Sequence, residues 1–182
     1  MYSFRNDYSE GAHPKVLQAL ADTNLRQTVG YGMDPCCQAA ADTIRRLCAA
    51  PDAAVHFLAG GTQVNLVTID AFLQSYEAVV AAQTGHVSTH ETGAIEATGH
   101  KVCTVESPDG NTRAELAALR QCCDVHGLFL YLDGARLGSA LTSPDNDLTL
   151  PDLAALTHAF TIGGTKNGAL FGEALVLTRP MP

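Results

Sequence analysis

One lysine stands in a turn rich in glycine and threonine, directly after a short apolar run. Residues 160–162 have the composition of a buried strand, and Lys166 follows them within the sequence Gly-Gly-Thr-Lys-Asn-Gly at positions 163–168. Lysine is normally a solvated surface charge. The chain has only 11 lysines and arginines among 182 residues, so a lysine placed among glycines at a predicted strand end suggests a chemical role.

An acidic residue occupies the same kind of position after another apolar run. Asp133 follows residues 128–132 and opens the sequence Asp-Gly-Ala-Arg. Parallel strands bring ligand sites to their carboxyl ends, so we expect Asp133 and Lys166 to face one crevice. An amine and a carboxylate in one crevice suit pyridoxal phosphate, with which the lysine forms a Schiff base while the aspartate pairs with the ring nitrogen.

Three more candidate groups follow predicted strands. Gly60, Gly61 and Thr62 join a strand to a helix, where free backbone N–H groups and the helix dipole favour a phosphate. His86 follows another strand and could stack on an aromatic ring or move protons. Arg136 could bind a carboxylate or a ring hydroxyl through its forked donors.

Each of these groups also has an ordinary structural explanation. The glycine turn could be a plain strand-to-helix connection, His86 a surface histidine and Arg136 half of a surface ion pair. Lys166 could be a solvated turn lysine and Asp133 a helix N-cap. What favours the chemical interpretation is that all five features fall at the ends of successive strands.

Predicted strands and helices alternate along the chain. The predicted strands cover residues 53–58, 78–82, 101–105, 128–132, 159–163 and 173–177. The predicted helices cover residues 13–23, 35–50, 62–75, 112–126 and 151–157. Val16, Leu17 and Leu20 share one face of the first helix, and Ile44 and Leu47 are spaced as core contacts of the second. The alternation predicts one α/β domain over residues 1–182, with a mostly parallel sheet covered on both faces by helices.

Composition and charge exclude several classes of partner. The chain is 46% hydrophobic and 16% charged, which permits a substantial core. A net charge of −8 argues against nucleic acid and anionic membranes as partners. The sequence contains no apolar stretch fit for a signal peptide or a membrane span, so we expect a cytoplasmic protein.

The cysteines and histidines give no metal motif. The six cysteines include the adjacent pairs Cys36–Cys37 and Cys122–Cys123, but no Cys-x-x-Cys spacing, and we expect all six to be reduced and most of them to be packing residues. His90 and Glu91 do not form a zinc-protease motif, because position 94 is Ala94. We therefore expect no metal.

An ordered set of motifs resembles a known family, the low-specificity L-threonine aldolases within the β-eliminating lyases of the fold-type I pyridoxal-phosphate enzymes. The resemblance extends over nearly all of the chain, and the matching segments are residues 4–11, 60–62, 85–86, 90–94, 133–137 and 163–168. The resemblance implies a fold-type I large domain in a homodimer or homotetramer. The implied reaction is cleavage of L-threonine, L-allo-threonine or a related 3-hydroxy amino acid to glycine and an aldehyde.

The resemblance also implies roles for particular residues. Lys166 corresponds to the Schiff-base lysine and Asp133 to the partner of the pyridinium nitrogen, whereas Gly60, Gly61 and Thr62 correspond to the phosphate site. The histidine that stacks on the ring and takes part in acid–base chemistry is matched by His86. Arg136 corresponds to a contact for the ring hydroxyl or the substrate carboxylate, and Asn6 to a polar residue near the substrate.

The chain departs from the family pattern in two places. Residues 107–111 connect the strand at 101–105 directly to the helix at 112, where the family has a further helix and a central strand. The family's C-terminal small domain has no counterpart before Pro182. Two alternatives to the aldolase interpretation therefore stay open: another pyridoxal-phosphate reaction, such as β-elimination or transamination, and a shortened remnant that binds cofactor without turnover.

Overall fold

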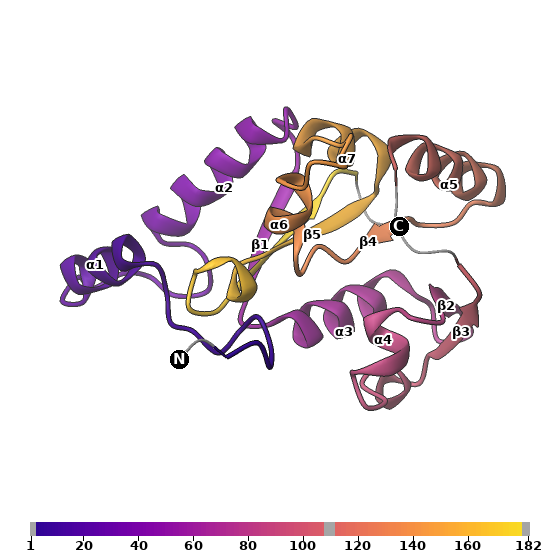
Figure 1. The fold of residues 1–182 in the computed structure, drawn as a ribbon, viewed down its shortest axis with the longest axis horizontal. Helices are drawn as coiled ribbons and strands as arrows, with labels where there is room; N and C mark the ends of the chain where they lie inside the picture. Colours follow the sequence, from indigo (N-terminus) through magenta and orange to yellow (C-terminus); the bar gives the residue numbers. More distant parts are fainter. Residues whose placement is uncertain (1–2, 108–111, 180–182) are drawn as a thin grey trace.

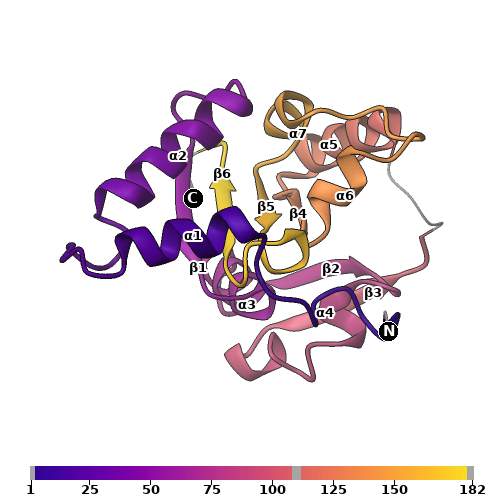
Figure 2. The same ribbon diagram turned by 60° about the vertical axis from the view of Figure 1, so that its left-hand side comes forward.

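The fold is an α/β arrangement built around a central four-stranded sheet (Figures 1 and 2). The computed structural model describes residues 3–107 and 112–179. Its α-helices are α1 (Pro14–Thr23), α2 (Pro35–Leu47), α3 (Gly61–Phe72), α4 (His86–Thr89), α5 (Arg113–His126), α6 (Leu137–Leu141) and α7 (Leu150–Leu156). Its strands are β1 (Ala54–Leu58), β2 (Ala78–Ala82), β3 (Lys101–Val105), β4 (Tyr131–Leu132), β5 (Ala159–Gly163) and β6 (Glu173–Leu177). Two 3₁₀ turns are η1 (Glu96–Thr98) and η2 (Thr165–Asn167).

The predicted α/β class is confirmed, but the strand pairing is mixed. The main sheet has the order β1-β6-β5-β4, in which β6 runs antiparallel to both of its neighbours and β4 runs parallel to β5. β2 and β3 form a separate parallel pair beside α4 (Figure 1). Among the described residues no strand joins β4 to β2. The direct connection predicted at residues 107–111 lies mostly outside the described residues, because 108–111 are not among them.

The two faces of the main sheet are covered by different helices. On one face Phe160 and Val176, both fully buried, pack with residues of α5, α6 and α7 and with the end of α2. On the other face Ala159 and Leu175 pack against Val64 and Phe72 of α3. Side chains alternate across a strand, so successive residues of β5 and β6 supply two separate cores.

The predicted caps of two helices are confirmed. The carboxylate of Asp34 accepts the backbone N–H groups of Cys36 and Cys37 at the start of α2. Thr112 and Glu115 form the capping box that opens α5, and Gly127 ends that helix in the left-handed conformation at φ 64°. These caps are made by residues close in the sequence, so local signals account for both ends of α5 and for the start of α2.

Two predictions about core residues and strand length need correction. Ile44 packs against the core as predicted, but Leu47 is 51% exposed, because Cys48 at the i+4 position takes the inward place and is buried. The strand predicted over 128–132 is reduced to β4. The N–H of Leu128 instead completes the C-terminal cap of α5 by donating to the carbonyl of Cys123, and the N–H of Leu130 donates to the His158 side chain.

Close packing of two backbones joins β4 to β5 at the point where both strands end. The N–H of Gly134 donates to Oγ1 of Thr161 at 2.6 Å, and the N–H of Gly163 donates to the carbonyl of Gly134 at 3.0 Å. A Cβ on Gly134 would lie 1.9 Å from the carbonyl oxygen of Thr161, and one on Gly163 would lie 2.3 Å from that of Ala135. Only glycine permits this approach.

Gly134→Ala is therefore expected to destabilise the protein by about 3 kcal/mol or more, since the new methyl group must displace backbone rather than a side-chain end. Denaturant unfolding of the purified protein measures the change. Gly30→Ala is the matched control, because a Cβ there meets no atom within 4 Å. Equal stability of the two variants would contradict the packing described here.

Candidate active site

The turn that carries Lys166 is held against the end of β5. Lys166 lies in η2, and the neighbouring Asn167 donates from Nδ2 to the carbonyl of Gly163 at 2.7 Å. Asn167 also packs against the helix that follows Asp133, because a Cβ on Gly138 would lie 2.6 Å from Asn167 Oδ1. The lysine turn and the aspartate turn therefore lie side by side, as the sequence predicted for the ends of neighbouring parallel strands.

The N-terminal segment crosses this edge and contacts both turns. Nζ of Lys166 lies 5.9 Å from the ring centroid of Tyr8. Arg136 binds the carboxylate of Asp7 through Nε and through Nη2, the second contact measuring 3.1 Å. Arg136 and Lys166, the two cations predicted for the site, are thus linked by consecutive residues of one segment.

Arg136 and Asp7 form a surface ion pair, which is the structural explanation that the sequence left open for Arg136 beside a binding role. The side chains of Arg136 and Asp7 are 57% and 45% exposed. The Arg136 guanidinium lowers the pKa of Asp7 and is itself held charged by the pair, its own pKa being raised. Because an exposed pair contributes only about 0.2–1 kcal/mol, another carboxylate can replace Asp7 at little cost.

Asn6 shapes the segment next to this ion pair. Its Oδ1 accepts the backbone N–H of Tyr8 at 3.1 Å and the hydroxyl of Ser9 at 2.7 Å. Side-chain acceptance of an N–H two residues ahead is the local turn that asparagine favours. Asn6 thus fixes the bend that presents Asp7 to Arg136 and Tyr8 to Lys166.

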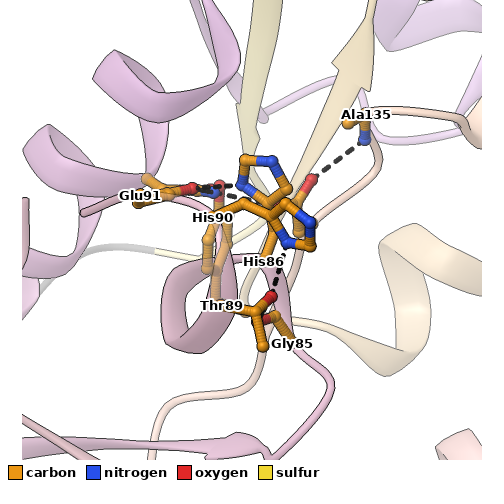
Figure 3. A network of polar contacts seen from close by, with 9 residues as sticks. Gly85, His86, Thr89, His90, Glu91 and Ala135 are labelled. Atoms are coloured by element: carbon orange, nitrogen blue, oxygen red, sulfur yellow. Dashed lines mark hydrogen bonds and ion pairs between the residues drawn. The ribbon is translucent and has the colours of Figure 1, made fainter. Parts of the chain in front are cut away.

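His86 is oriented by a buried carboxylate. Its Nδ1 lies 2.8 Å from Oε1 of Glu91, whose side chain is fully buried, while the His86 side chain is 40% exposed (Figure 3). One face of the imidazole stacks on His90, with ring centroids 5.3 Å apart and planes inclined by 12°. One hydrogen bond and one stacked ring therefore hold His86 in place. His90 covers one face of the His86 imidazole and leaves the other face uncovered by His90.

Asn65 connects Glu91 to Asp133. Its Nδ2 donates to Glu91 Oε1 at 2.7 Å and to Asp133 Oδ2 at 2.9 Å, and its Oδ1 accepts from the hydroxyl of Tyr131 at 2.6 Å. The second oxygen of Asp133 accepts the N–H of Ala135 at 3.0 Å, which is a local turn contact (Figure 3). Burial and the negative charges of Asp133 and Glu91 raise the pKa of Tyr131, so its hydroxyl keeps its proton and donates.

The N-terminus of α3 is open. Gly60 is the N-cap in an extended conformation, and no side chain caps this helix. A Cβ on Gly60 or Gly61 would meet no atom within 4 Å, and Thr62 is exposed. A twelve-residue helix with an uncapped, glycine-lined N-terminus presents N–H groups and a positive dipole end to an anion.

Glu173 of β6 is a buried carboxyl beneath the lysine turn. Thr165 donates from its hydroxyl to Glu173 Oε1 at 3.1 Å, and Glu173 Oε2 has no partner among the described residues. Burial raises the pKa of Glu173. This contact fixes the residue that precedes Lys166.

The carboxylates near His86 resemble a metal site in spacing only. One ligand atom each from His86, Glu91 and Asp133 lies within 4.8 Å of the others. Asn65 places amide hydrogens against both carboxylates, and a cation would have to displace these donors.

The sequence did not identify Asn65, Tyr131, Asp7 or Glu91 as members of the site. Asp7 and Glu91 lie inside motifs that the sequence singled out, but Asp7 pairs with Arg136 across 129 positions and Glu91 meets Asn65 across 26. Asn65 gave one signal, since it is a polar residue in an otherwise apolar stretch, Val64 to Val67, of a predicted helix.

Comparison with known proteins places the chain among lyases. The family model described as beta-eliminating lyase matches residues 4–115. A low specificity L-threonine aldolase from a Pseudomonas species is 30% identical over 95% of this chain and 61% of its own length. Another from Pseudomonas aeruginosa is 28% identical over the same shares.

A solved structure is more similar still. The threonine aldolase of Leishmania major superposes with a TM-score of 0.95 and 48% identity, over 98% of this chain and 63% of that one. The chain thus spans a little over 60% of the length of these relatives. None of the described helices has the length and apolar composition needed to cross a membrane.

Titration of Asp7 tests the geometry of the N-terminal segment. The pKa of Asp7 is lower in the folded protein than in the unfolded chain. The ion pair therefore stabilises the fold fully at a pH above the unfolded pKa. This stabilisation is lost as the pH falls through the folded pKa. NMR titration is expected to show the pKa of Asp7 below its ordinary range, and Arg136→Gln is expected to raise that pKa. An Asp7 titration unchanged by Arg136→Gln would contradict the pairing.

Proposed function

We propose, because this chain belongs to the beta-eliminating lyase family, that it binds pyridoxal 5'-phosphate and cleaves L-threonine, L-allo-threonine or a related 3-hydroxy amino acid to glycine and an aldehyde. The names of its relatives support threonine as the substrate class. The observation that carries the proposal is the contact between the Asp133 turn and the Lys166 turn at one sheet edge.

The residues present fit this cofactor. The open N-terminus of α3 at Gly60, Gly61 and Thr62 suits its phosphate. Asp133 suits the ring nitrogen and Lys166 the aldehyde. The face of His86 opposite His90 is available to stack on the ring. When bound, pyridoxal phosphate supplies an aldehyde for condensation with amines and a ring that accepts the electron pair of a breaking bond.

The remaining steps belong to side chains of this chain. Arg136 exchanges the carboxylate of Asp7 for that of the amino acid, which orients the substrate by two parallel hydrogen bonds. Asn6 places its side-chain amide next to Asp7, where the substrate carboxylate would bind. Orientation is decisive here, because the bond that breaks is the one held perpendicular to the plane of the ring.

His86 is the candidate base for the substrate's β-hydroxyl. Glu91 Oε1 already accepts a hydrogen bond from Asn65, so His86 Nδ1 donates its proton to the same oxygen. In the neutral imidazole this leaves a lone pair on Nε2, which can accept the hydroxyl proton as the Cα–Cβ bond breaks. The aldehyde then leaves, and the same nitrogen gives the proton to Cα of the remaining fragment, which becomes glycine.

We include in the proposal a homodimer or homotetramer in the cytoplasm. None of the residues of α1 is buried, and the segment after it exposes Leu25, Tyr31 and Met33, which is the kind of apolar surface that subunit contacts cover. All six cysteines are free thiols, which suits a reducing compartment. The single domain over residues 1–182 is part of the same proposal.

Lys166→Ala tests the cofactor site. The chain has three lysines, so Lys15→Ala and Lys101→Ala are matched controls. With added pyridoxal phosphate, the unmodified protein and both controls are expected to show a visible absorbance band and to release glycine from threonine. Lys166→Ala is expected to lose the band and the glycine release together. A band that survives in Lys166→Ala, or that disappears in Lys15→Ala, would contradict the site. A band without glycine release in the unmodified protein would overturn the aldolase activity and leave the cofactor site standing.

A further inference from the structure

Asn65 is the point at which the cofactor-facing groups are joined. Asn65 is 2% exposed, and its side chain makes three hydrogen bonds to residues from two parts of the fold. Asp133 follows β4, Tyr131 lies in β4, and Glu91 follows α4. An amide has two hydrogens and one oxygen, and all three are directed at these partners.

The orientation of the amide is determined by charge. Two carboxylates lie on the Nδ2 side, so a flipped amide would place its oxygen against both of them. The hydroxyl of Tyr131 lies on the other side and retains its proton. A donor on the oxygen side also polarises the amide and strengthens both N–H contacts to the carboxylates.

Glu91 depends on this amide. Its two hydrogen bonds, from Asn65 and from His86, both end on Oε1, and Oε2 has no partner among the described residues. Without Asn65, the buried carboxylate would keep only His86 as a donor and would face Asp133 with no hydrogen between them. Two like charges at this separation would push the groups apart or draw in a proton.

We infer that Asn65 is a positioning residue that holds Asp133 and, through Glu91, His86 as one unit, fixing the proton of His86 on Nδ1 and leaving Nε2 as the acceptor. The inference rests on the proposed function, since it assigns the unit to the ring nitrogen and ring face of the cofactor. In the protein without cofactor, too, Asn65 sets the tautomer of His86 through Glu91, without contacting His86 itself.

The test uses Asn65→Leu, which keeps the number and branching of the side chain's heavy atoms and removes all three hydrogen bonds. In the cofactor-free protein, ¹⁵N NMR of the His86 ring is expected to show a proton fixed on Nδ1 in the unmodified protein and a mixture of tautomers in Asn65→Leu. In the loaded protein, kcat for glycine release is expected to fall about 10- to 100-fold with KM within about threefold of its original value. Tyr131→Phe, which removes only the hydroxyl on the far side of the amide, is expected to change both readouts in the same direction by less.

Asn146→Leu is the control for a purely structural role. Asn146 donates from Nδ2 to the carbonyls of Leu141 and Leu148 and contacts no residue of the site. Its loss is expected to lower stability while leaving the His86 tautomer and kcat unchanged. If Asn65→Leu does not fold, Tyr131→Phe decides by the same two readouts.

An Asn65→Leu protein that keeps the original His86 tautomer and kcat would overturn the inference. A protein in which His86 responds as expected, but which binds no pyridoxal phosphate, would overturn the proposed function and not the positioning of His86. The two failures are therefore distinguishable.

Discussion

The site depends on the close approach of two backbones at the ends of β4 and β5. Parallel pairing of these strands places the Asp133 turn and the Lys166 turn at the same edge, and the contact between Gly134 and Gly163 removes the space between them. The carboxylate of Asp133 and the amine of Lys166 thereby lie on turns that are packed against each other rather than on free loops. Precision of this kind is what a cofactor held at two ends requires.

Three acidic side chains lie in the polar network around this contact. Asp133 and Glu91 both accept hydrogen bonds from Asn65, Glu173 accepts one from Thr165 of the lysine turn, and the two glutamates are buried. Burying carboxylates is costly unless donors meet them. Asn65 serves two of them and Thr165 serves the third, so the polar network keeps the turns in place and also determines which atoms can exchange protons.

The sequence predicted the parts of this structure that local rules determine. Asp34 and Thr112 cap their helices as expected because a cap is formed by residues two or three positions away. Lys166, Asp133 and His86 could be proposed as site residues because each follows a strand of recognisable composition. Asn65 could not, because its partners Glu91 and Asp133 are 26 and 68 positions away, nor could the pairing of Arg136 with Asp7 across 129 positions. The shortening of β4 was missed for the same reason, since His158 takes the hydrogen bond that a longer strand would have used.

The most direct test of the account is the chemical location of the cofactor. Borohydride reduction of the protein with pyridoxal phosphate fixes the cofactor to the amine with which it has condensed, and peptide mapping by mass spectrometry then identifies that lysine. The account predicts a label on the peptide that contains Lys166 and none on the peptides that contain Lys15 or Lys101. A label confined to Lys15 or Lys101, or absent from all three, would contradict it.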